Sequence, residues 1–473
     1  MQKAIYWFRQ DLRLYDNPAL MEASNYAEIL PIYIVDSQTP KQYQIGAASK
    51  WWLHNSLTSL NKSLNNNLNI YHAPPLDIIK NLIKDYNIDA IFWNRCYEPF
   101  AIQRDKEIKE YLQSNNIKNK SFNASLLWEP WEIKKTDGSE YKVFTPYYRK
   151  GCLLATSPAK PLDKPNNLAL VKDKSSLSIS QLNLLPEIKW YISLEKCWSI
   201  GEKSAKESLY KFIENGLDNY KIGRDFPATS YVSRLSPHIH FGEISIRQIW
   251  HTIAAIDNDN SNIDHFLSEL GWREFSYYQL YNHPTLPEQN LQRKFDKFAW
   301  QINDKNLKAW QTGNTGIPLV DAGMRELWQT GYMHNRIRMV VGSFLVKNLR
   351  LHWKHGEQWF WDTLVDADLA SNCASWQWVA GCGNDAAPYF RIFNPITQGE
   401  KFDPNGEYIR KYIPELAKLP TKYIYAPWQA PTQVLEQANI TLGTDYPLPI
   451  VDLKLSREQA LLAFQALKNN KDD

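Results

Sequence analysis

The chain has 473 residues, more than a single hydrophobic core usually serves, so we expect two domains. Hydrophobic residues make up 44% and charged residues 22%, as in an ordinary globular protein, and a formal net charge of +3 is too small to indicate nucleic-acid binding by itself. Five cysteines without a CxxC pair argue against a disulfide framework. The N-terminus is charged where a signal peptide would be apolar, and no run approaches transmembrane length. We therefore expect a cytoplasmic protein without a membrane segment.

Residues 1–130 alternate short β-rich runs with helix-like segments. The β-rich runs are residues 4–8, 29–35, 68–71 and 88–93, and helical patterns include residues 48–64 and 75–85. This alternation predicts a doubly wound parallel sheet, that is, a Rossmann-like α/β domain. Because no GxGxxG follows the first run, we do not expect a dinucleotide to bind there in the Rossmann manner.

Residues 131–200 are predicted to form a connector, and residues 201–473 an all-helical domain. Residues 155–200 are rich in Pro, Lys and Ser and show no lasting periodicity. Helical periodicity returns near residue 200, as in SLYKFIENGL and DHFLSELGWREFSYYQLY. The sequence thus predicts an α/β domain followed by an all-α domain.

The stretch DADLASNCASWQWVAGCGNDAAPYFRIFNP, residues 366–395, combines polar and aromatic residues that a plain core does not need. If Asp366 and Asp368 open a helix, their charges suit its positive end. Asn372 and Trp376 would then share one helix face, and Trp378 would point away from it. Taken singly, each of these residues is more often a cap or a core residue.

Taken whole, this stretch and its continuation TQGEKFDPNGEYIRKYIPEL resemble the flavin-binding core of the DNA photolyase and cryptochrome family. WFRQDLRLYDNPAL, GAASKWWLHNSL and FWNRCYEPFAIQRD resemble the first domain of the same family. The resemblance is greatest to bacterial photolyases for cyclobutane pyrimidine dimers. It implies bound FAD, damaged DNA as the partner, a carbon-carbon lyase activity, no metal, and a monomer.

The resemblance also raises the question of a second, light-harvesting chromophore, either methenyltetrahydrofolate or 8-hydroxydeazaflavin. At positions where folate-binding relatives place antenna contacts, this chain has Phe100, Ala101, Pro287 and Glu288. These residues depart from the polar and basic set that such a site uses. A differently placed folate, a deazaflavin and no antenna at all therefore remain open.

The segment YKIGRDFPATSYVSRLSPHIHFGEIS suits an anion, because small hydroxyl residues and backbone amides precede a helix there. Alone it would be an ordinary Ser cap. The resemblance implies that this turn holds the FAD pyrophosphate, although Val232 stands where the family usually has Thr. It also implies that Arg338 pairs with Asp366. The implied cofactor residues are Tyr220, Val232, Ser233, Arg234, Leu235, Ser236, Arg338, Asp366, Ala367, Asp368 and Asn372.

Two further helical segments, SELGWREF and GYMHNRIRMVVGSF, carry the implied substrate residues. Offsets of three and four place Glu269, Trp272 and Arg273 on one helix face, where a Glu and Arg four apart most often form a surface salt bridge. The resemblance implies instead that Trp272 stacks on an extruded pyrimidine pair and Glu269 bonds to a base. His334 should be packed or solvated rather than a catalytic acid. The implied substrate and DNA residues are Arg224, Glu269, Trp272, Arg273, Asn335, Arg336, Met339, Trp378, Arg391 and Gln398.

The implied catalytic residues include a chain of tryptophans. On sequence grounds Trp300, Trp353 and Trp376 would be core residues, but they match the family's path for electrons from the surface to the flavin. Asn372 would face flavin N5, where plant cryptochromes carry Asp. With Glu269 these residues complete the implied catalytic set.

The resulting hypothesis is light-driven repair of cyclobutane pyrimidine dimers by electron transfer from photoexcited reduced FAD to a flipped-out lesion. The alternative is a cryptochrome-type blue-light photoreceptor without repair activity, although Asn372, Glu269 and Met339 are of the repair type. A third hypothesis, a metal-dependent hydrolase using Asp366 and Asp368 with His352 or His355, explains neither the Trp pattern nor the lack of an HxxxH motif.

Overall fold

The computed structural model describes residues 2–256, 260–386 and 390–469, and it divides into two compact units. Unit 1 comprises Met1–Glu214, Ser233–Pro284 and Val365–Ala370, and unit 2 comprises Asn215–Val232, Thr285–Leu364 and Ser371–Asp473. The chain passes between the units several times, so short segments from late in the sequence complete unit 1. The predicted sequence divisions at residues 130 and 200 stay a prediction.

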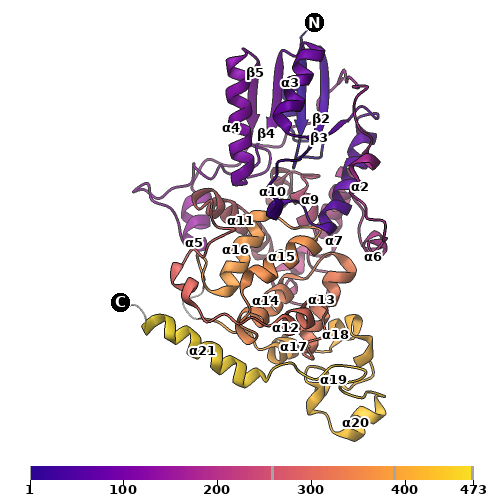
Figure 1. Cartoon of the computed structure of the whole chain (residues 1–473), viewed down its shortest axis with the longest axis vertical. Helices are drawn as coiled ribbons and strands as arrows, with labels where there is room; N and C mark the ends of the chain where they lie inside the picture. The colour runs from indigo at the N-terminus through magenta and orange to yellow at the C-terminus, as the bar shows by residue number, and fades with distance from the viewer. Residues whose placement is uncertain (1, 257–259, 387–389, 470–473) are drawn as a thin grey trace. The chain divides into compact units, whose positions relative to one another are not determined.

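Unit 1 contains a five-stranded parallel sheet with the order β3-β2-β1-β4-β5 (Figure 1). The strands are β1 (Lys3–Phe8), β2 (Glu28–Asp36), β3 (Asn69–Ala73), β4 (Ala90–Asn94) and β5 (Lys118–Phe122). The first four confirm the predicted β-rich runs. Strand β5, KNKSF, was not predicted, because this partly exposed edge strand has almost no apolar residues to mark it.

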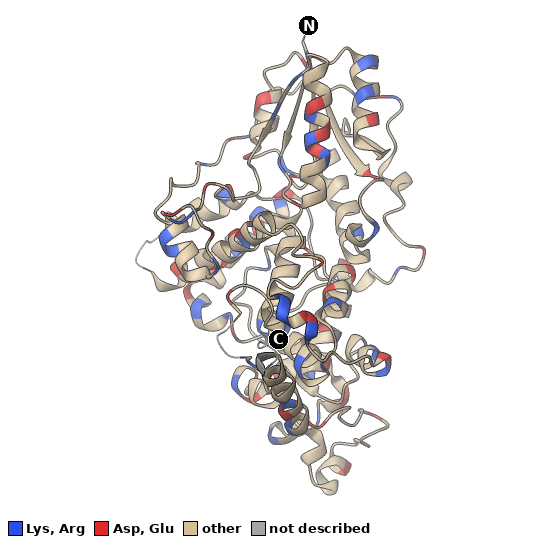
Figure 2. Ribbon diagram, turned by 60° about the vertical axis from the view of Figure 1, so that its left-hand side comes forward, with Lys and Arg blue, Asp and Glu red and all other residues tan. Residues whose placement is uncertain are grey.

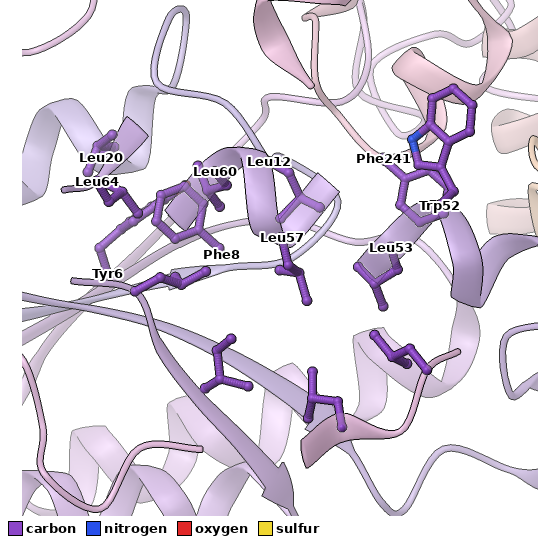
Figure 3. Packing of buried hydrophobic residues seen from close by; sticks show 14 of the residues in the cluster. Tyr6, Phe8, Leu12, Leu20, Trp52, Leu53, Leu57, Leu60, Leu64 and Phe241 are labelled. Carbon is purple, nitrogen blue, oxygen red and sulfur yellow. The ribbon is translucent and has the colours of Figure 1, made fainter. Parts of the chain in front are cut away.

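Helices pack on both faces of this sheet, as the doubly wound prediction requires. They are α1 (Pro18–Ala23), α2 (Ala47–Ser63), α3 (Pro75–Tyr86) and α4 (Pro99–Ser114). Alternate side chains of β1 point to opposite faces: Tyr6 and Phe8 join the cluster with Trp52 and Leu57 of α2 (Figure 3), whereas Trp7 joins the cluster on the other face. Each face thus has its own hydrophobic core.

Beyond the sheet, the regular elements of the described residues are helices, which confirms the predicted all-α C-terminal region. Between residues 155 and 200 the helical pieces are only four residues long: the 3-10 turn Ile179–Leu182 and the helix α6 (Ile192–Glu195). The α-helices are α5 (Phe144–Pro146), α6 (Ile192–Glu195), α7 (Glu202–Asn215), α8 (Tyr220–Gly223), α9 (Ser236–His240), α10 (Ile246–Ala254), α11 (Ser261–Asn282), α12 (Asp304–Gln311), α13 (Pro318–Thr330), α14 (Asn335–Ser343), α15 (Trp353–Thr363), α16 (Leu369–Ala380), α17 (Pro395–Phe402), α18 (Glu407–Tyr412), α19 (Thr421–Ile424), α20 (Thr432–Gln437) and α21 (Leu453–Asn469). Further 3-10 turns lie at Lys41–Tyr43, Leu217–Asn219, Arg293–Lys297, Pro414–Leu416 and Pro427–Gln429, and π-helical turns at Tyr147–Cys152 and Phe344–Asn348.

Two of the helices that carry implied site residues, α11 and α14, begin at polar caps. Asn260 caps α11 by accepting a hydrogen bond from the Asn262 backbone N–H, and His334 caps α14 through the Arg336 N–H. These caps favour the observed starts of the two helices.

Acidic and basic side chains are interspersed along the ribbon (Figure 2), in keeping with the small net charge of +3. A binding surface for an anionic polymer must therefore come from a few particular side chains. Among the described helices, none is long and apolar enough to cross a membrane.

Candidate functional site

The implied site residues fall into two sets, one in each compact unit. Unit 1 contains Ser233, Arg234, Leu235, Ser236, Glu269, Trp272, Arg273, Asp366, Ala367 and Asp368. Unit 2 contains Tyr220, Arg224, Val232, Trp300, Asn335, Arg336, Arg338, Met339, Trp353, Asn372, Trp376, Trp378, Arg391 and Gln398. The implied pairing of Arg338 with Asp366 joins residues of different units and stays a prediction.

In unit 1, Asp366 lies against the turn that was expected to hold a pyrophosphate. The Ser236 hydroxyl donates to Asp366 Oδ2 at 2.6 Å. Arg234, two residues earlier, has a φ of 52° in the left-handed region, and its guanidinium lies 4.2 Å from the Trp198 ring centroid. A non-glycine residue in this conformation marks a tight turn that the surroundings hold in place. Since α16 begins at Leu369, both carboxylates precede that helix.

Asp368 is the centre of a buried hydrogen-bonded network. The Tyr277 hydroxyl donates to Asp368 Oδ2 at 2.5 Å, and His240 Nδ1 lies 3.7 Å from the same oxygen. Burial alone would raise the pKa of Asp368, but the nearby His240, the charge of Arg273 and the Tyr277 hydrogen bond outweigh it and hold the pKa well below its usual range. Asp368 is thus an ionised, oriented carboxylate that can accept N–H groups.

Helix α11 presents Trp272 as a supported flat surface. The Trp272 ring lies parallel to Phe144, with ring centroids 3.8 Å apart and an interplanar angle of 13°. Arg273 does not serve as a solvated surface ion: its Nη1 donates to the Ser125 carbonyl at 2.7 Å, and its guanidinium covers the Tyr277 ring at 4.6 Å. Glu269, one turn earlier, is partly exposed. The recognition face implied by the resemblance is compatible with this arrangement.

In unit 2, the amide of Asn372 is oriented by α15. Its Nδ2 donates to the Glu357 carbonyl oxygen at 3.0 Å, which leaves Oδ1 as the atom to accept a hydrogen bond from a ligand. The Cys373 thiol donates to Glu357 Oε1 at 3.1 Å, and burial raises the pKa of Glu357 to about 7. An N–H donor such as the N5–H of a reduced flavin suits this fixed oxygen.

The three implied electron-path tryptophans all lie in unit 2. His352 lies between two of them, with its ring 4.9 Å from Trp300 and 5.5 Å from Trp353. The Trp353 Nε1 donates to Asn290 Oδ1 at 2.8 Å. Trp376 is buried and meets α15 directly, because a Cβ on Gly356 would lie 2.1 Å from its ring.

Trp378 projects into different surroundings from Trp376, as the helical periodicity predicted. Its Nε1 donates to the Asp385 carbonyl at 3.0 Å, and its side chain is only partly buried. The two indoles of α16 therefore contact different parts of unit 2.

Arginines gather around Phe402 and His334. The Arg336 guanidinium lies 4.3 Å from the Phe402 ring centroid and pairs with Asp225 at 2.6 Å. Burial, together with the nearby charge of Arg224 and the smaller effects of Arg336 and Arg338, lowers the pKa of His334 to about 4. His334 is a packed residue, as predicted, and it is neutral at physiological pH.

The remaining implied DNA residues are distributed over α14, α17 and the segment before α17. Asn335 and Arg391 are exposed, whereas Met339 is partly buried. Gln398 stands one turn before Phe402 on α17, and its Oε1 is buried and has no hydrogen-bond partner among the described residues. Arg338 Nε donates to the Met333 carbonyl at 2.7 Å.

Each unit, taken by itself, offers groups that suit part of FAD. Unit 1 offers the turn from Ser233 to Ser236, at the start of α9, for a pyrophosphate, and it offers two oriented carboxylates, Asp366 and Asp368. Unit 2 offers the Asn372 oxygen and the Tyr220 ring, which is 8% exposed. These are the acceptors and donors that a flavin ring and its phosphates require.

Sequence reasoning missed the residues that support this site. Tyr277 and His240 hold Asp368, Phe144 supports Trp272, and Asp225 pairs with Arg336. Tyr277 had a local signal, since it follows Arg273 by one helical turn on α11. The other three come from segments distant in sequence, where no local pattern points to the contact.

Comparison with known proteins agrees with both halves of the chain. Residues 4–166 match the family model described as DNA photolyase, and residues 266–466 match the FAD binding domain of DNA photolyase. The chain is 44% identical to the deoxyribodipyrimidine photo-lyase of Agrobacterium fabrum over 98% of each protein. It is 39% identical to Cryptochrome-1 of Arabidopsis thaliana over 95% of this chain and 68% of that protein. The crystal structure of a bacterial class III photolyase from Agrobacterium tumefaciens superposes with a TM-score of 0.95 at 44% identity, over 99% of this chain and 98% of that chain.

The chain therefore belongs to the DNA photolyase family. It is a photolyase-type enzyme with FAD as its cofactor, and DNA repair is the function that these matches support.

Proposed function

We propose that this enzyme repairs cyclobutane pyrimidine dimers in DNA with light. The observation that carries the proposal is the 44% identity to a deoxyribodipyrimidine photo-lyase across 98% of both chains. The geometry supports it, because Asn372 keeps an amide oxygen available and Trp272 is held flat on Phe144.

Bound FAD, when reduced and excited by blue light, supplies the electron that splits the cyclobutane ring and takes it back afterwards. In this proposal the turn at Ser233 to Ser236 binds the pyrophosphate through backbone amides, Asp366 and Asp368 accept N–H groups of the ring system, and the Asn372 oxygen faces N5. The protein thus orients the cofactor and fixes the charges around it.

The substrate side follows from stacking and charge. Extruding a lesion, which already stacks poorly, costs about a few kcal/mol, and base stacking on an aromatic ring returns roughly 1 to 3 kcal/mol per base. Trp272 and Trp378 would provide that stacking, with Glu269, Asn335 and Met339 completing the cavity. Arg224, Arg336 and Arg391, with Gln398, would contact the strand without reading its sequence. Arg273, which was also implied as a DNA residue, bonds to Ser125 and covers Tyr277, so we propose that it supports the cavity instead.

The proposed path for reducing the flavin runs from Trp300 through Trp353 to Trp376. In support, His352 lies between the first two rings, and α15 carries both Trp353 and the glycine against which Trp376 packs. All three side chains belong to unit 2. A second chromophore in the N-terminal region, a folate or a deazaflavin, remains a proposal, as do the cytoplasmic location and the monomeric state.

The test is repair of an oligonucleotide containing one thymine dimer by the fully reduced holoprotein. Repair restores the ultraviolet absorbance of the separated bases, and we expect this recovery under blue light and none in darkness. The 39% identity to Cryptochrome-1 makes a photoreceptor without repair activity the competing hypothesis. Absence of recovery in the light, with fully reduced flavin confirmed by its spectrum, would refute the proposal and favour that alternative.

A further inference from the structure

The ion pair between Arg336 and Asp225 occupies a guanidinium that the proposed function assigns to a DNA phosphate. Arg336 Nη2 lies 2.6 Å from Asp225 Oδ1, and the two side chains are 18% and 34% exposed. A partly exposed ion pair contributes little net stability. A phosphate can therefore replace the carboxylate at small cost.

Phe402 contacts Arg336 and the residue that follows Asp225 in the chain. The Arg336 guanidinium lies over its ring at 4.3 Å, and the Phe226 ring, next to Asp225 in the chain, meets Phe402 edge-on at 6.0 Å. The guanidinium is thus held by the aromatic ring as well as by the carboxylate.

Asp225 is also the negative charge within a basic cluster. Burial and the charges of Arg224, Arg336 and Arg338 all act to lower the pKa of His334, and Asp225 alone among the named neighbours acts to raise it. Asp225 therefore lies close to the arginines that the proposed function places on the DNA backbone, where a phosphate would experience its repulsion.

From this geometry we propose that Asp225 is an internal substitute for a DNA phosphate, which occupies Arg336 in the free enzyme and weakens its hold on DNA. The inference rests on the proposed function, in which Arg336 contacts the backbone. Because phosphate contacts are independent of sequence and damage, the carboxylate lowers affinity for damaged and intact DNA alike. It thereby favours release of the repaired strand.

The test measures the affinity of the holoprotein for DNA in the dark, by fluorescence anisotropy of labelled duplexes. One duplex contains a single thymine dimer and the other is intact, and each is titrated at a series of salt concentrations. The variants are Asp225→Asn, which keeps the shape and removes the charge, Asp225→Ala, and the conservative Asp225→Glu. The matched control is Glu415→Gln, because Glu415 forms a similar pair with Arg325 at 2.7 Å, with side chains 31% and 19% exposed.

We expect Asp225→Asn and Asp225→Ala to bind both duplexes about three- to fivefold more tightly at low salt, the size of change that a partly exposed ion pair produces. The slope of log affinity against log salt should steepen by roughly 0.9, because one more phosphate is neutralised. Asp225→Glu should keep the wild-type slope, and Glu415→Gln should leave both quantities unchanged.

Weaker DNA binding by Asp225→Asn would overturn the inference, because it would mean that the carboxylate positions Arg336 for DNA. An equal change in DNA binding by Glu415→Gln would also overturn it, because only the net charge of the protein would then matter. If Asp225→Ala does not fold, the isosteric Asn variant decides alone. Failure of the proposed function can be distinguished from failure of this inference. A wild-type enzyme that neither prefers nor repairs the dimer would refute the proposed function. Binding of the variants to intact DNA would still show whether Asp225 competes with a phosphate for Arg336.

Discussion

Gly356 tests how closely the structure packs Trp376 against α15. A Cβ at Gly356 would lie 2.1, 2.5 and 2.5 Å from three Trp376 ring carbons, whereas ordinary carbon contacts are about 3.5 to 4 Å. The ring would have to withdraw by more than an ångström, yet Phe360 and Trp310 pack against it with ring centroids 5.0 and 6.2 Å away. Overpacking of this kind costs about 3 kcal/mol, and Ala regains ~1 kcal/mol of helix propensity, so Gly356→Ala should destabilise by about 2 kcal/mol.

Gly342→Ala is the matched control, since it faces the same indole from α14. Its Cβ would lie 3.3 Å from Val379 and 3.6 Å from the Trp376 ring, distances that a small adjustment accommodates. We expect this variant to be neutral or slightly stabilised. The assay is thermal unfolding of the holoprotein, with light-driven flavin reduction as a second readout that should slow only in Gly356→Ala. Equal unfolding temperatures for the two variants would refute the packing described for Trp376.

Three further predictions concern the cofactor residues and acid stability. Asn372→Asp should lower repair and favour a flavin protonated at N5 during illumination. The reason is that a carboxylate facing the Glu357 carbonyl keeps a hydrogen bond to it only when the carboxylate carries a proton. Absorbance spectra recorded during illumination test this prediction, and spectra like those of the wild type would contradict the assignment of Asn372. Ser236→Ala removes the 2.6 Å bond to Asp366 and should weaken FAD retention roughly tenfold, measured by the fluorescence of released flavin. The pKa of His334 is lowered from 6.5 to about 4 in the folded chain. Between these two pH values the unfolded chain therefore binds a proton that the folded chain does not. The free energy of unfolding should thus fall by up to about 3 kcal/mol as the pH drops from 6.5 to 4. His334→Asn keeps an N-cap acceptor but has no group that titrates in this range. In urea unfolding, the difference between its free energies of unfolding at pH 5 and pH 7.5 should be much smaller than that of the wild type. An unchanged difference would rule out His334 as the source of the acid sensitivity.

Local patterns were enough to predict the fold class and the elements that carry the site. Alternating apolar runs predicted β1 to β4, and helical periodicity predicted the positions of Asn372, Trp376 and Trp378 around α16, because such patterns reflect which side of an element is buried. Strand β5 was not predicted, since its polar sequence carries no such pattern. The order of polar and aromatic residues from Asp366 onward pointed to the family, which the matches over both halves of the chain confirmed.

The partners that give those residues their chemistry were decided by tertiary structure. Ser236 reaches Asp366 across 130 positions of sequence, Tyr277 reaches Asp368 across 91, and Arg336 reaches Asp225 across 111. No periodicity relates residues so far apart, because their contact depends on how whole elements pack. The sequence by itself therefore determined which residue types are available, whereas packing decided which carboxylate is ionised, which amide oxygen is free, and which arginine is already paired.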